Sequence, residues 1–430
     1  MARPGRWGGA LPLGRAHLPV CYAGGMARFE PFPGLRYDTE LAPLGEVVAP
    51  PYDVVDEACR KLLATRSPYN AIHVELPEPD EARGLDRYAH AATLLDAWQR
   101  EGVLRADDTA ALYVYRMRFR EDGLGERSTT GVIGALALDV EGGSEVLPHE
   151  RTMPKPKGDR LDLLRATRTN LSPIWGLSLA TGLAAACRDA TGGLAAPMHV
   201  SDEEGVDHEL WPVVDPTAIA AITDLVGSTP VVIADGHHRY ETATFYRNEV
   251  RGATGGAGGP HDLVMALVVE LSEEELVVRP THRLVSALPA DLDLVEVLQP
   301  FFEAEPTSVD LAKLPALMAE RGALGLVTAE GTFLLLPTPD LEASAEADLD
   351  SSRLDVALAA LPAHEIVYQH GTRPVADAVA SGQSQAGFLL RPATVAQIAE
   401  TAHSGRRMPP KTTFFHPKPR TGLVLRSLER

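Results

Sequence analysis

The stretch VVIADGHHRYETA, residues 231–243, decides the fold of this chain. Its first four residues are apolar, which predicts a buried strand, and the residues after Arg239 resemble the first turns of a helix. Gly236 allows the backbone to turn sharply between the two. The first N–H groups of a helix have no partners inside it, so they favour an anion at that point. The stretch therefore predicts a strand, a turn and a helix, with a phosphate seated at the turn.

The side chains of this turn suit a phosphate site. Arg239 can donate two parallel hydrogen bonds to a phosphate, and His237 and His238 can donate hydrogen bonds or move protons. Asp235 can hold a metal ion such as Mg²⁺. We therefore predict a catalytic role for Asp235, His237 and His238, a metal-binding role for Asp235, and phosphate or nucleotide contacts from Gly236, His238, Arg239 and Thr242.

Two other interpretations of the turn stay open. Asp235 could cap the helix while the histidines pack locally, because an Asp-Gly turn is common in proteins. The adjacent histidines could instead join His282 or His149 around one metal ion. Neighbouring histidines point apart, however, and the sequence has no HxH or HExxH spacing that would support a metal site.

A long polar stretch, residues 147–179, contains a local run of basic residues in an otherwise acidic chain. It is either a disordered, solvated insert or a loop that forms part of a site. If it is a loop of that kind, its basic residues could bind an anionic ligand. Glu150 and Lys155 are then its best individual candidates.

Two further stretches place polar side chains at predicted strand ends, where open mixed sheets bind ligands. They are THR at residues 281–283 and a predicted strand at residues 71–76 that contains Glu75. The remaining predicted site residues are Glu75 and Glu150 as catalytic carboxylates, Lys155, His282 and Arg283 as phosphate contacts, and Tyr52 and Asp53 as substrate contacts. Near the C-terminus, Phe414 and Phe415 are expected to pack in the structure and not to stack on bases.

Periodicity and turn residues predict the other elements. Asp56 is the expected N-cap of a helix that runs to Leu63. The other predicted helices cover residues 82–101, 355–363 and 394–404, and the predicted strands cover residues 111–120, 131–140, 262–271 and 387–392, with a hairpin at 324–337. The Gly-rich residues 252–259 lack the GK[ST] ending of a phosphate loop and are expected to be a connector.

The composition limits the partners of the chain. Its 430 residues, 45% of them apolar, suffice for one large or two ordinary domains. The formal charge of -19 disfavours nucleic acid as a partner. The three cysteines have no CxxC spacing, and no run of about 18 apolar residues could span a membrane. We therefore expect a cytoplasmic protein, with a homodimer open, and residues 1–25 as a disordered extension and not a signal peptide.

A series of motifs in order resembles the bacterial family catalogued as domain of unknown function 1015. The motifs are RFEPFPGLRYD, APPYDVVDE, SPYNAIHVELPE, LPHERTMPKPKGDRLDLLRAT, IADGHHRYETA, THR and MPPKTTFFHPK, and the resemblance covers nearly everything from Met26 to the end. The DGHHR turn also resembles the ParB and sulfiredoxin-like superfamily, in which this turn binds nucleotide phosphates. That superfamily includes free-serine kinases and CTP-binding partition proteins.

These resemblances imply a fold and a function. The implied fold is mixed α/β, with a ParB/sulfiredoxin-like core and large family-specific elaborations. Residues 26–430 would form a single unit, with the phosphate-binding core around residues 216–290. The chain lacks an evident helix-turn-helix module and a cysteine near the turn, which separates it from the partition proteins and from the sulfiredoxins.

The leading hypothesis is a small-molecule kinase that uses Mg²⁺ and transfers a phosphoryl group from ATP or ADP to a hydroxyl group. Free serine is the first acceptor to test. One alternative is a nucleotide-binding regulatory or adaptor protein without chemistry. Another is a metal-dependent hydrolase or nuclease built on the histidines.

Overall fold

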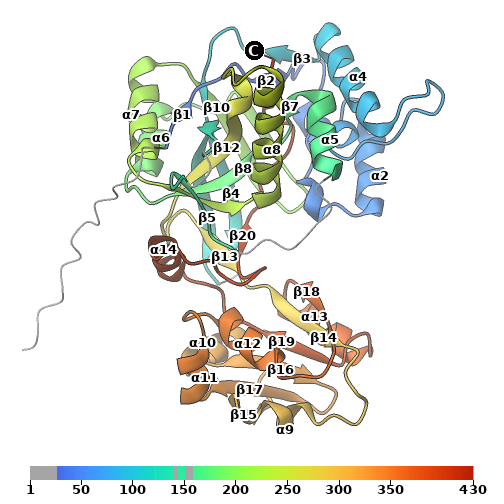
Figure 1. Ribbon diagram of the computed structural model, residues 1–430, viewed down its shortest axis with the longest axis vertical. Helices are drawn as coiled ribbons and strands as arrows, with labels where there is room; N and C mark the ends of the chain where they lie inside the picture. The colour runs from blue at the N-terminus through green and yellow to red at the C-terminus, as the bar shows by residue number, and fades with distance from the viewer. Residues whose placement is uncertain (1–26, 122, 140–142, 151–157, 430) are drawn as a thin grey trace, which may run out of the picture.

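The computed structural model describes residues 27–121, 123–139, 143–150 and 158–429. It has a large and a small lobe, joined by a narrow region in which β13 (Val277–Arg279) pairs antiparallel with β20 (Phe414–His416) (Figure 1). The chain enters the small lobe after β13 and returns through α14 (Val395–His403) and β20. The predicted extension at residues 1–25 lies outside the described residues, and the single unit at residues 26–430 stays a prediction.

The large lobe contains a nine-stranded sheet in the order β6-β11-β8-β12-β5-β4-β10-β9, with β1 beside β5. The pairs β6·β11 and β8·β12 are parallel and the other pairs are antiparallel. Its strands are β1 (Phe29–Glu30), β4 (Leu112–Glu121), β5 (Gly125–Ala137), β6 (Val146–Pro148), β8 (Ile174–Ser178), β9 (Met198–Ser201), β10 (Asp207–Val213), β11 (Val231–Asp235) and β12 (Leu263–Glu270). A mixed sheet with helices on its faces confirms the predicted α/β class.

Both faces of the central strands are buried, which explains their long apolar runs. In β12, Met265 and Leu267 face one core while Val264 and Ala266 face the other, as the two-residue period of a strand requires. Residues of α4 (Arg87–Arg100) and α5 (Gly158–Thr167) belong to the first core. Residues of α6 (Leu183–Ala190) and α7 (Pro216–Gly227) belong to the second.

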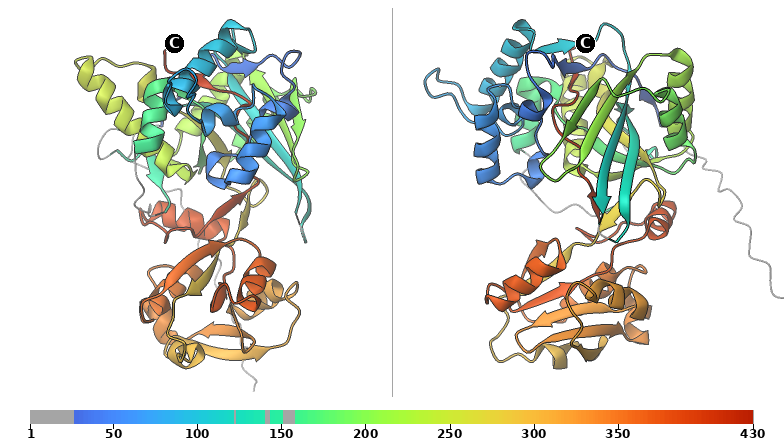
Figure 2. Two further views of the ribbon diagram at one scale, coloured as in Figure 1. Left: turned by 90° about the vertical axis from the view of Figure 1, so that its right-hand side faces the viewer. Right: turned by 180° about the vertical axis from the view of Figure 1, so that it is seen from behind.

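The remaining elements of the large lobe surround this sheet (Figures 1 and 2). Helix α8 (His237–Ala253) packs against α5, β8 and β12. The others are α1 (Leu44–Val47), η1 (Tyr52–Val54), α2 (Glu57–Arg66), α3 (Ile72–Glu75), η2 (Pro260–Asp262) and the strand pairs β2 (Leu35–Tyr37) with β3 (Leu104–Ala106) and β7 (Thr169–Asn170) with β21 (Arg426–Ser427). No helix among the described residues has both the length and the apolar character needed to cross a bilayer.

The small lobe is a six-stranded antiparallel sheet in the order β15-β17-β16-β19-β14-β18, with its own helices. The strands are β14 (His282–Ser286), β15 (Phe302–Thr307), β16 (Leu324–Thr328), β17 (Thr332–Pro337), β18 (Glu365–Gln369) and β19 (Ala386–Leu389). The helices are α9 (Leu294–Leu298), α10 (Leu314–Arg321), α11 (Pro339–Ser344), α12 (Asp350–Leu358) and α13 (Thr372–Ala380). The hairpin predicted at residues 324–337 is formed by β16 and β17 and is confirmed.

Several other predicted helices, strands and turns are confirmed, and these are the ones that depend on residues close together in the sequence. β11, the turn at Gly236 and α8 are the predicted strand, turn and helix. Asp56 caps α2, because its side chain accepts a hydrogen bond of 2.8 Å from the N–H of Cys59. β4, β5, β12, β19, α12 and α14 overlap their predicted ranges.

Two local predictions are wrong, and a third differs at one boundary. Residues 71–76 are not a strand, because the Asn70 side chain accepts a 2.9 Å hydrogen bond from the N–H of Ile72 and starts the short helix α3. Residues 281–283 do not end a strand. Pro280, which has no N–H to donate, separates β13 from β14, and β14 begins at His282. The helix predicted at residues 82–101 is confirmed as α4, but it begins only at Arg87, because Asp86 caps it.

The polar stretch at residues 147–179 is neither one long loop nor one long insert. It contains the end of β6, then α5, β7 and β8. Residues 151–157, which include the predicted phosphate contact Lys155, lie outside the described residues.

Candidate functional site

The turn between β11 and α8 has the backbone that only glycine adopts easily. Gly236 lies in the left-handed region with φ 85° and is the N-cap of α8, without a side-chain cap. A Cβ atom at this position would lie 3.0 Å from Nε of Arg239 and 3.1 Å from its Cζ. Glycine therefore lets the Arg239 guanidinium fold back over the turn.

The carboxylate of Asp235 is held between two cations. Its Oδ1 is 3.0 Å from Nζ of Lys418, and its Oδ2 is 3.0 Å from Nη2 of Arg239. Burial alone would raise the pKa of Asp235, but Lys418 and Arg239 hold that pKa well below its ordinary value. The N-cap of α8 is Gly236 and no side chain caps the helix, so the interpretation of Asp235 as a helix cap is wrong; both of its oxygens contact cationic side chains.

Arg239 is fixed on its other side by the loop before β8. Its Nη1 donates to the carbonyl oxygen of Pro173 and, at 3.2 Å, to Oγ of Ser172. The ring of Tyr52 lies 4.6 Å from the guanidinium carbon of Arg160 and 6.0 Å from that of Arg239. Tyr52 thus contacts two guanidinium groups, a favourable arrangement for an aromatic face.

Glu75 lies behind Arg239 and does not line the space in front of the turn. It is 2% exposed, its Oε1 is 3.6 Å from Nη1 of Arg160, and Ser172 donates to it at 3.3 Å. Burial raises the pKa of Glu75 despite Arg160 and Arg239. Glu75 and Thr242 line a small cavity of about 60 Å³ on this side of Arg239.

Glu150 is fixed by the backbone of the C-terminal segment. Its carboxylate accepts hydrogen bonds from the N–H groups of Lys411 at 3.0 Å, Thr412 at 3.2 Å and Thr413 at 3.0 Å. Burial opposes ionisation, but His149 and these N–H groups lower the pKa of Glu150 to about 2. Glu150 is therefore ionised at neutral pH and has a defined orientation.

Two histidines connect Glu150 to the turn. Nε2 of His149 lies 3.4 Å from Oε1 of Glu150 and 2.8 Å from Oγ1 of Thr413. The rings of His149 and His237 have centroids 5.2 Å apart. His238 is half-buried, with its Nδ1 3.8 Å from Oε2 of Glu241.

These groups surround one cavity of about 220 Å³ in front of the turn. The predicted site residues that line it are Tyr52, Asp53, Glu150, Asp235, Gly236, His237, His238 and Arg239. His282 and Arg283 do not line it. His282 accepts a hydrogen bond from the N–H of Leu390 at 3.1 Å, and the Arg283 guanidinium stacks 4.6 Å from the ring of Tyr368.

Six further polar or aromatic residues line the same cavity and were not predicted as site residues. They are Thr281, His370, Lys411, Phe414 and Lys418, together with Thr413. The MPPKTTFFHPK motif was the available signal, because it contributes Lys411 and Lys418. Phe415 packs in the core as predicted. Phe414 instead faces the cavity, with Lys418 5.0 Å above its ring.

The described part of the chain contains no group of three or more His, Cys, Asp or Glu side chains arranged to hold a metal ion. His237 and His149 are close, but His149 is committed to Thr413 and to the carbonyl oxygen of Ile233. Of the carboxylates that line the cavity, Asp53 is the exposed one.

The buried histidines predict a loss of stability in mild acid. Burial lowers the pKa of His237 and of His282 to about 4, whereas an unfolded histidine titrates near about 6.5. Between these values the unfolded chain binds more protons. We therefore expect the free energy of unfolding to fall as the pH drops from about 6.5 to about 4, by about 1.4 kcal/mol per pH unit for each histidine.

Urea titrations across this pH range measure the slope. His237→Asn should make it shallower by the share of one histidine. A free energy of unfolding that stays constant down to the lower limit would contradict the assignment of both histidines as buried and neutral.

Comparison with known proteins places the chain in a family. Residues 29–357 match the family described as protein of unknown function (DUF1015). No curated protein matches the chain. Among solved structures, a conserved hypothetical protein from Pyrococcus furiosus has 16% identity and a TM-score of 0.37, with 70% of this chain and 96% of that chain covered.

A free serine kinase in complex with AMP has 16% identity and a TM-score of 0.36, with 66% of this chain and 86% of that chain covered. Likeness at this level does not indicate a shared activity. The family match, in contrast, spans most of the chain and confirms the resemblance inferred from the motifs. The chain therefore belongs to the family described as protein of unknown function (DUF1015).

Proposed function

We propose that the protein is a kinase that transfers a phosphoryl group from ATP or ADP to a hydroxyl group of a small metabolite, with free serine as the first acceptor to test. The observation that supports this proposal is the cavity at the start of α8. One of its walls suits phosphates, and the carboxylates of Glu150 and Asp53, which also line it, suit an acceptor.

The phosphate wall is the turn and its cations. Lys418 and Arg239 share the single acid Asp235, which leaves one net positive charge beside the positive end of the α8 dipole. His237 and His238 add donors at the same helix start. Phosphoryl transfer is catalysed mainly by positioning and by charge stabilisation, and this wall supplies both.

The acceptor wall contains Glu150 and Asp53. Glu150 is ionised and held by three N–H groups, so it can accept a hydrogen bond from the acceptor hydroxyl or pair with an acceptor ammonium group. We assign the catalytic carboxylate to Glu150. Glu75 is the weaker candidate, because Arg239 separates it from this cavity. A hydroxylated amino acid, which carries both groups, suits this wall.

Magnesium would enter with the nucleotide. Mg²⁺ in kinases is bound by one or two carboxylates together with substrate phosphates. Asp53 is exposed at the cavity and suits that role, whereas Asp235 already faces two cations. When bound, Mg²⁺ would neutralise phosphate charge.

One observation favours a second candidate function, a nucleotide-binding regulatory or adaptor protein. Oε1 of Glu150 accepts hydrogen bonds from the N–H groups of Thr412 and Thr413 and from the Thr413 hydroxyl, and Oε2 accepts one from Lys411. A carboxylate so fully engaged is a weak proton acceptor. The same cavity would then bind nucleotide without transfer.

The first test is product formation. Purified protein is incubated with Mg²⁺, with either ATP or ADP, and with a pool of hydroxylated metabolites that includes serine. We expect mass spectrometry to detect a new phosphate ester, with phosphoserine as the first candidate. Lys61→Ala, on the exposed side of α2, is the matched control. Bound nucleotide without any ester would favour the adaptor function over the kinase.

The second test is the guanidinium of Arg239. Arg239→Lys keeps the charge but removes the planar fork that contacts Asp235, Ser172 and Pro173, so we expect kcat/KM to fall about 100-fold. Arg321→Lys, which alters the exposed pair with Glu305, is the control. Steady-state kinetics measure both. Normal turnover by a folded Arg239→Lys or His238→Ala enzyme would remove the turn from the mechanism.

A further inference from the structure

The cavity has one wall that arrives from the end of the chain. We call residues Pro410–Arg420 the C-terminal strap; it includes β20, and it contributes Lys411, Phe414 and Lys418 to the cavity. The chain beyond it continues into the large lobe, where Leu425 pairs with Leu35 of β2 and β21 pairs with β7 (Figure 1). The strap is held at two separate places, and the second of them lies outside the cavity.

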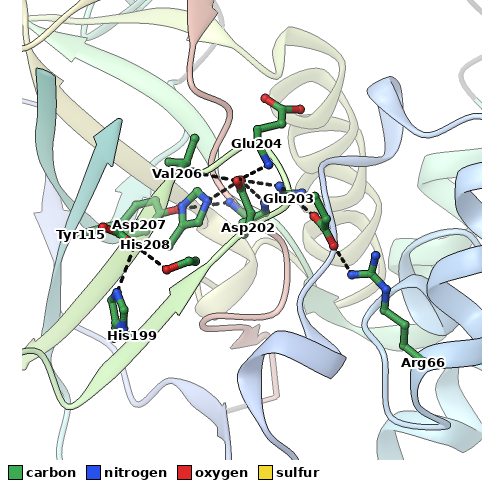
Figure 3. A network of polar contacts seen from close by, with 11 residues as sticks. Arg66, Tyr115, His199, Asp202, Glu203, Glu204, Val206, Asp207 and His208 are labelled. Atoms are coloured by element: carbon green, nitrogen blue, oxygen red, sulfur yellow. Dashed lines mark hydrogen bonds and ion pairs between the residues drawn. The ribbon is translucent and has the colours of Figure 1, made fainter. Parts of the chain in front are cut away.

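The first place is Glu150, whose carboxylate accepts hydrogen bonds from the N–H groups of Lys411 and Thr413. The second is a buried polar network beside the turn between β9 and β10, drawn in Figure 3. There Asp202, His208 and Tyr115 form a chain of contacts. Nε2 of His208 is 2.9 Å from Oδ2 of Asp202, and Nδ1 of His208 is 2.7 Å from the Tyr115 hydroxyl.

Arg420 closes this network into a ring. Its guanidinium binds Oδ2 of Asp202, with Nε at 3.1 Å, and its backbone N–H donates to the Tyr115 hydroxyl at 3.2 Å. The Asp202 side chain is 6% exposed, that of His208 is 0% exposed and that of Arg420 is 7% exposed. Water therefore does not compete for these contacts.

The proton positions in the ring follow from the charge of Asp202. Burial opposes ionisation, but His208 and Arg420 hold the pKa of Asp202 well below its ordinary value, while burial lowers the pKa of His208. An ionised Asp202 only accepts, so Nε2 of neutral His208 donates to it and Nδ1 accepts from the Tyr115 O–H. The Tyr115 oxygen then accepts from the N–H of Arg420. Every member is satisfied, and both the backbone and the side chain of Arg420 are fixed.

This ring lies two residues from a cation of the site. Lys418, which contacts Asp235, precedes Arg420 by one intervening residue, so the ring fixes the backbone from which Lys418 extends. Thr421 follows directly and pairs with Ala49, three residues before Tyr52. The same anchor therefore fixes both the strap and the loop that carries Tyr52 and Asp53.

We propose that Arg420 is a positioning residue for the cavity: through its ring with Asp202, His208 and Tyr115 it holds the C-terminal strap so that Lys418 stays against Asp235. The kinetic consequence rests on the proposed function, whereas the structural consequence does not. A buried arginine that only stabilised the large lobe would affect the central sheet as much as the strap. A positioning role therefore predicts faster hydrogen exchange in the strap alone, whereas a purely stabilising role predicts it in the strap and in the central sheet.

Hydrogen–deuterium exchange of the full chain tests this difference. In Arg420→Gln we expect the N–H groups of β20 and of Thr421, which donates to the carbonyl oxygen of Ala49, to exchange about tenfold faster or more, while β12 keeps its protection. The matched control is Arg66→Gln, which removes the partner of the exposed Glu203 at the edge of the same network and should leave the strap unchanged. Unchanged exchange in the strap, or equal loss in the strap and β12, would overturn the proposal.

Two milder variants keep the test decisive if Arg420→Gln does not fold. Tyr115→Phe removes one oxygen from the ring, so we expect a smaller increase in exchange at the same residues. Arg420→Lys keeps the charge, so we expect its strap to exchange faster than in the wild type but to retain part of the protection. A strap that exchanges as in the wild type in both variants would overturn the proposal.

Kinetics separate this proposal from the proposed function. With the kinase assay, Arg420→Gln should lower kcat/KM about tenfold or more, Arg420→Lys should recover part of it, and Arg66→Gln should have no effect. If the strap loosens but the wild type forms no phosphate ester, the positioning role stands and the kinase function fails. If the wild type is active and the variants match it in exchange and kinetics, the positioning role fails alone.

Discussion

The ion pairs of Asp235 with Lys418 and Arg239 are the contacts on which the rest of the site depends. A buried carboxylate is costly unless cations or hydrogen bonds compensate it, and here the two cations come from α8 and from the end of the chain. The positions of β11, the start of α8 and the strap are therefore mutually dependent. Removing Asp235 leaves two cations without their shared acid, whereas removing either cation takes away the surplus positive charge of this wall.

The charged groups around Arg239 also explain why the two cavities on either side of it differ. In front of it, Asp235 is neutralised by two cations and the wall keeps a positive character. Behind it, Glu75 is buried beside Arg160 and Arg239 and has a raised pKa. The ring of Tyr52 lies against the guanidinium groups of both arginines. Arg239 thus divides a supporting layer from the wall that faces a ligand.

The sequence correctly predicted the features that depend on residues close together in the chain. The strand, turn and helix around Gly236 follow from a local apolar run, one glycine and the helix that succeeds it, and the cap at Asp56 follows from one side chain. It also predicted eight of the residues that line the cavity, because the DGHHR turn and the motif around Glu150 are compact. Location, oligomeric state and the role of each site residue stay predictions.

The sequence did not reveal contacts between distant segments. Lys418, Thr281 and His370 reach the cavity only through the pairing of β13 with β20 and the crossing between the lobes. Residues 71–76 became a helix because Asn70 binds the backbone of Ile72, which outweighs the apolar alternation. His282 and Arg283 had suitable chemistry, but Pro280 places them inside the small lobe's sheet. Such outcomes depend on tertiary packing and not on local pattern.

The central claim is that the wall formed by the α8 turn and Lys418 binds the phosphates of a nucleotide. Calorimetric titration of the wild type and of Lys418→Met with ADP, inorganic triphosphate and adenosine measures it directly. The account predicts that ADP and triphosphate bind, that adenosine binds far more weakly, and that Lys418→Met weakens ADP binding about tenfold or more, since each tenfold corresponds to about 1.4 kcal/mol. Adenosine binding as tightly as ADP, or ADP affinity unaffected by Lys418→Met, would contradict it.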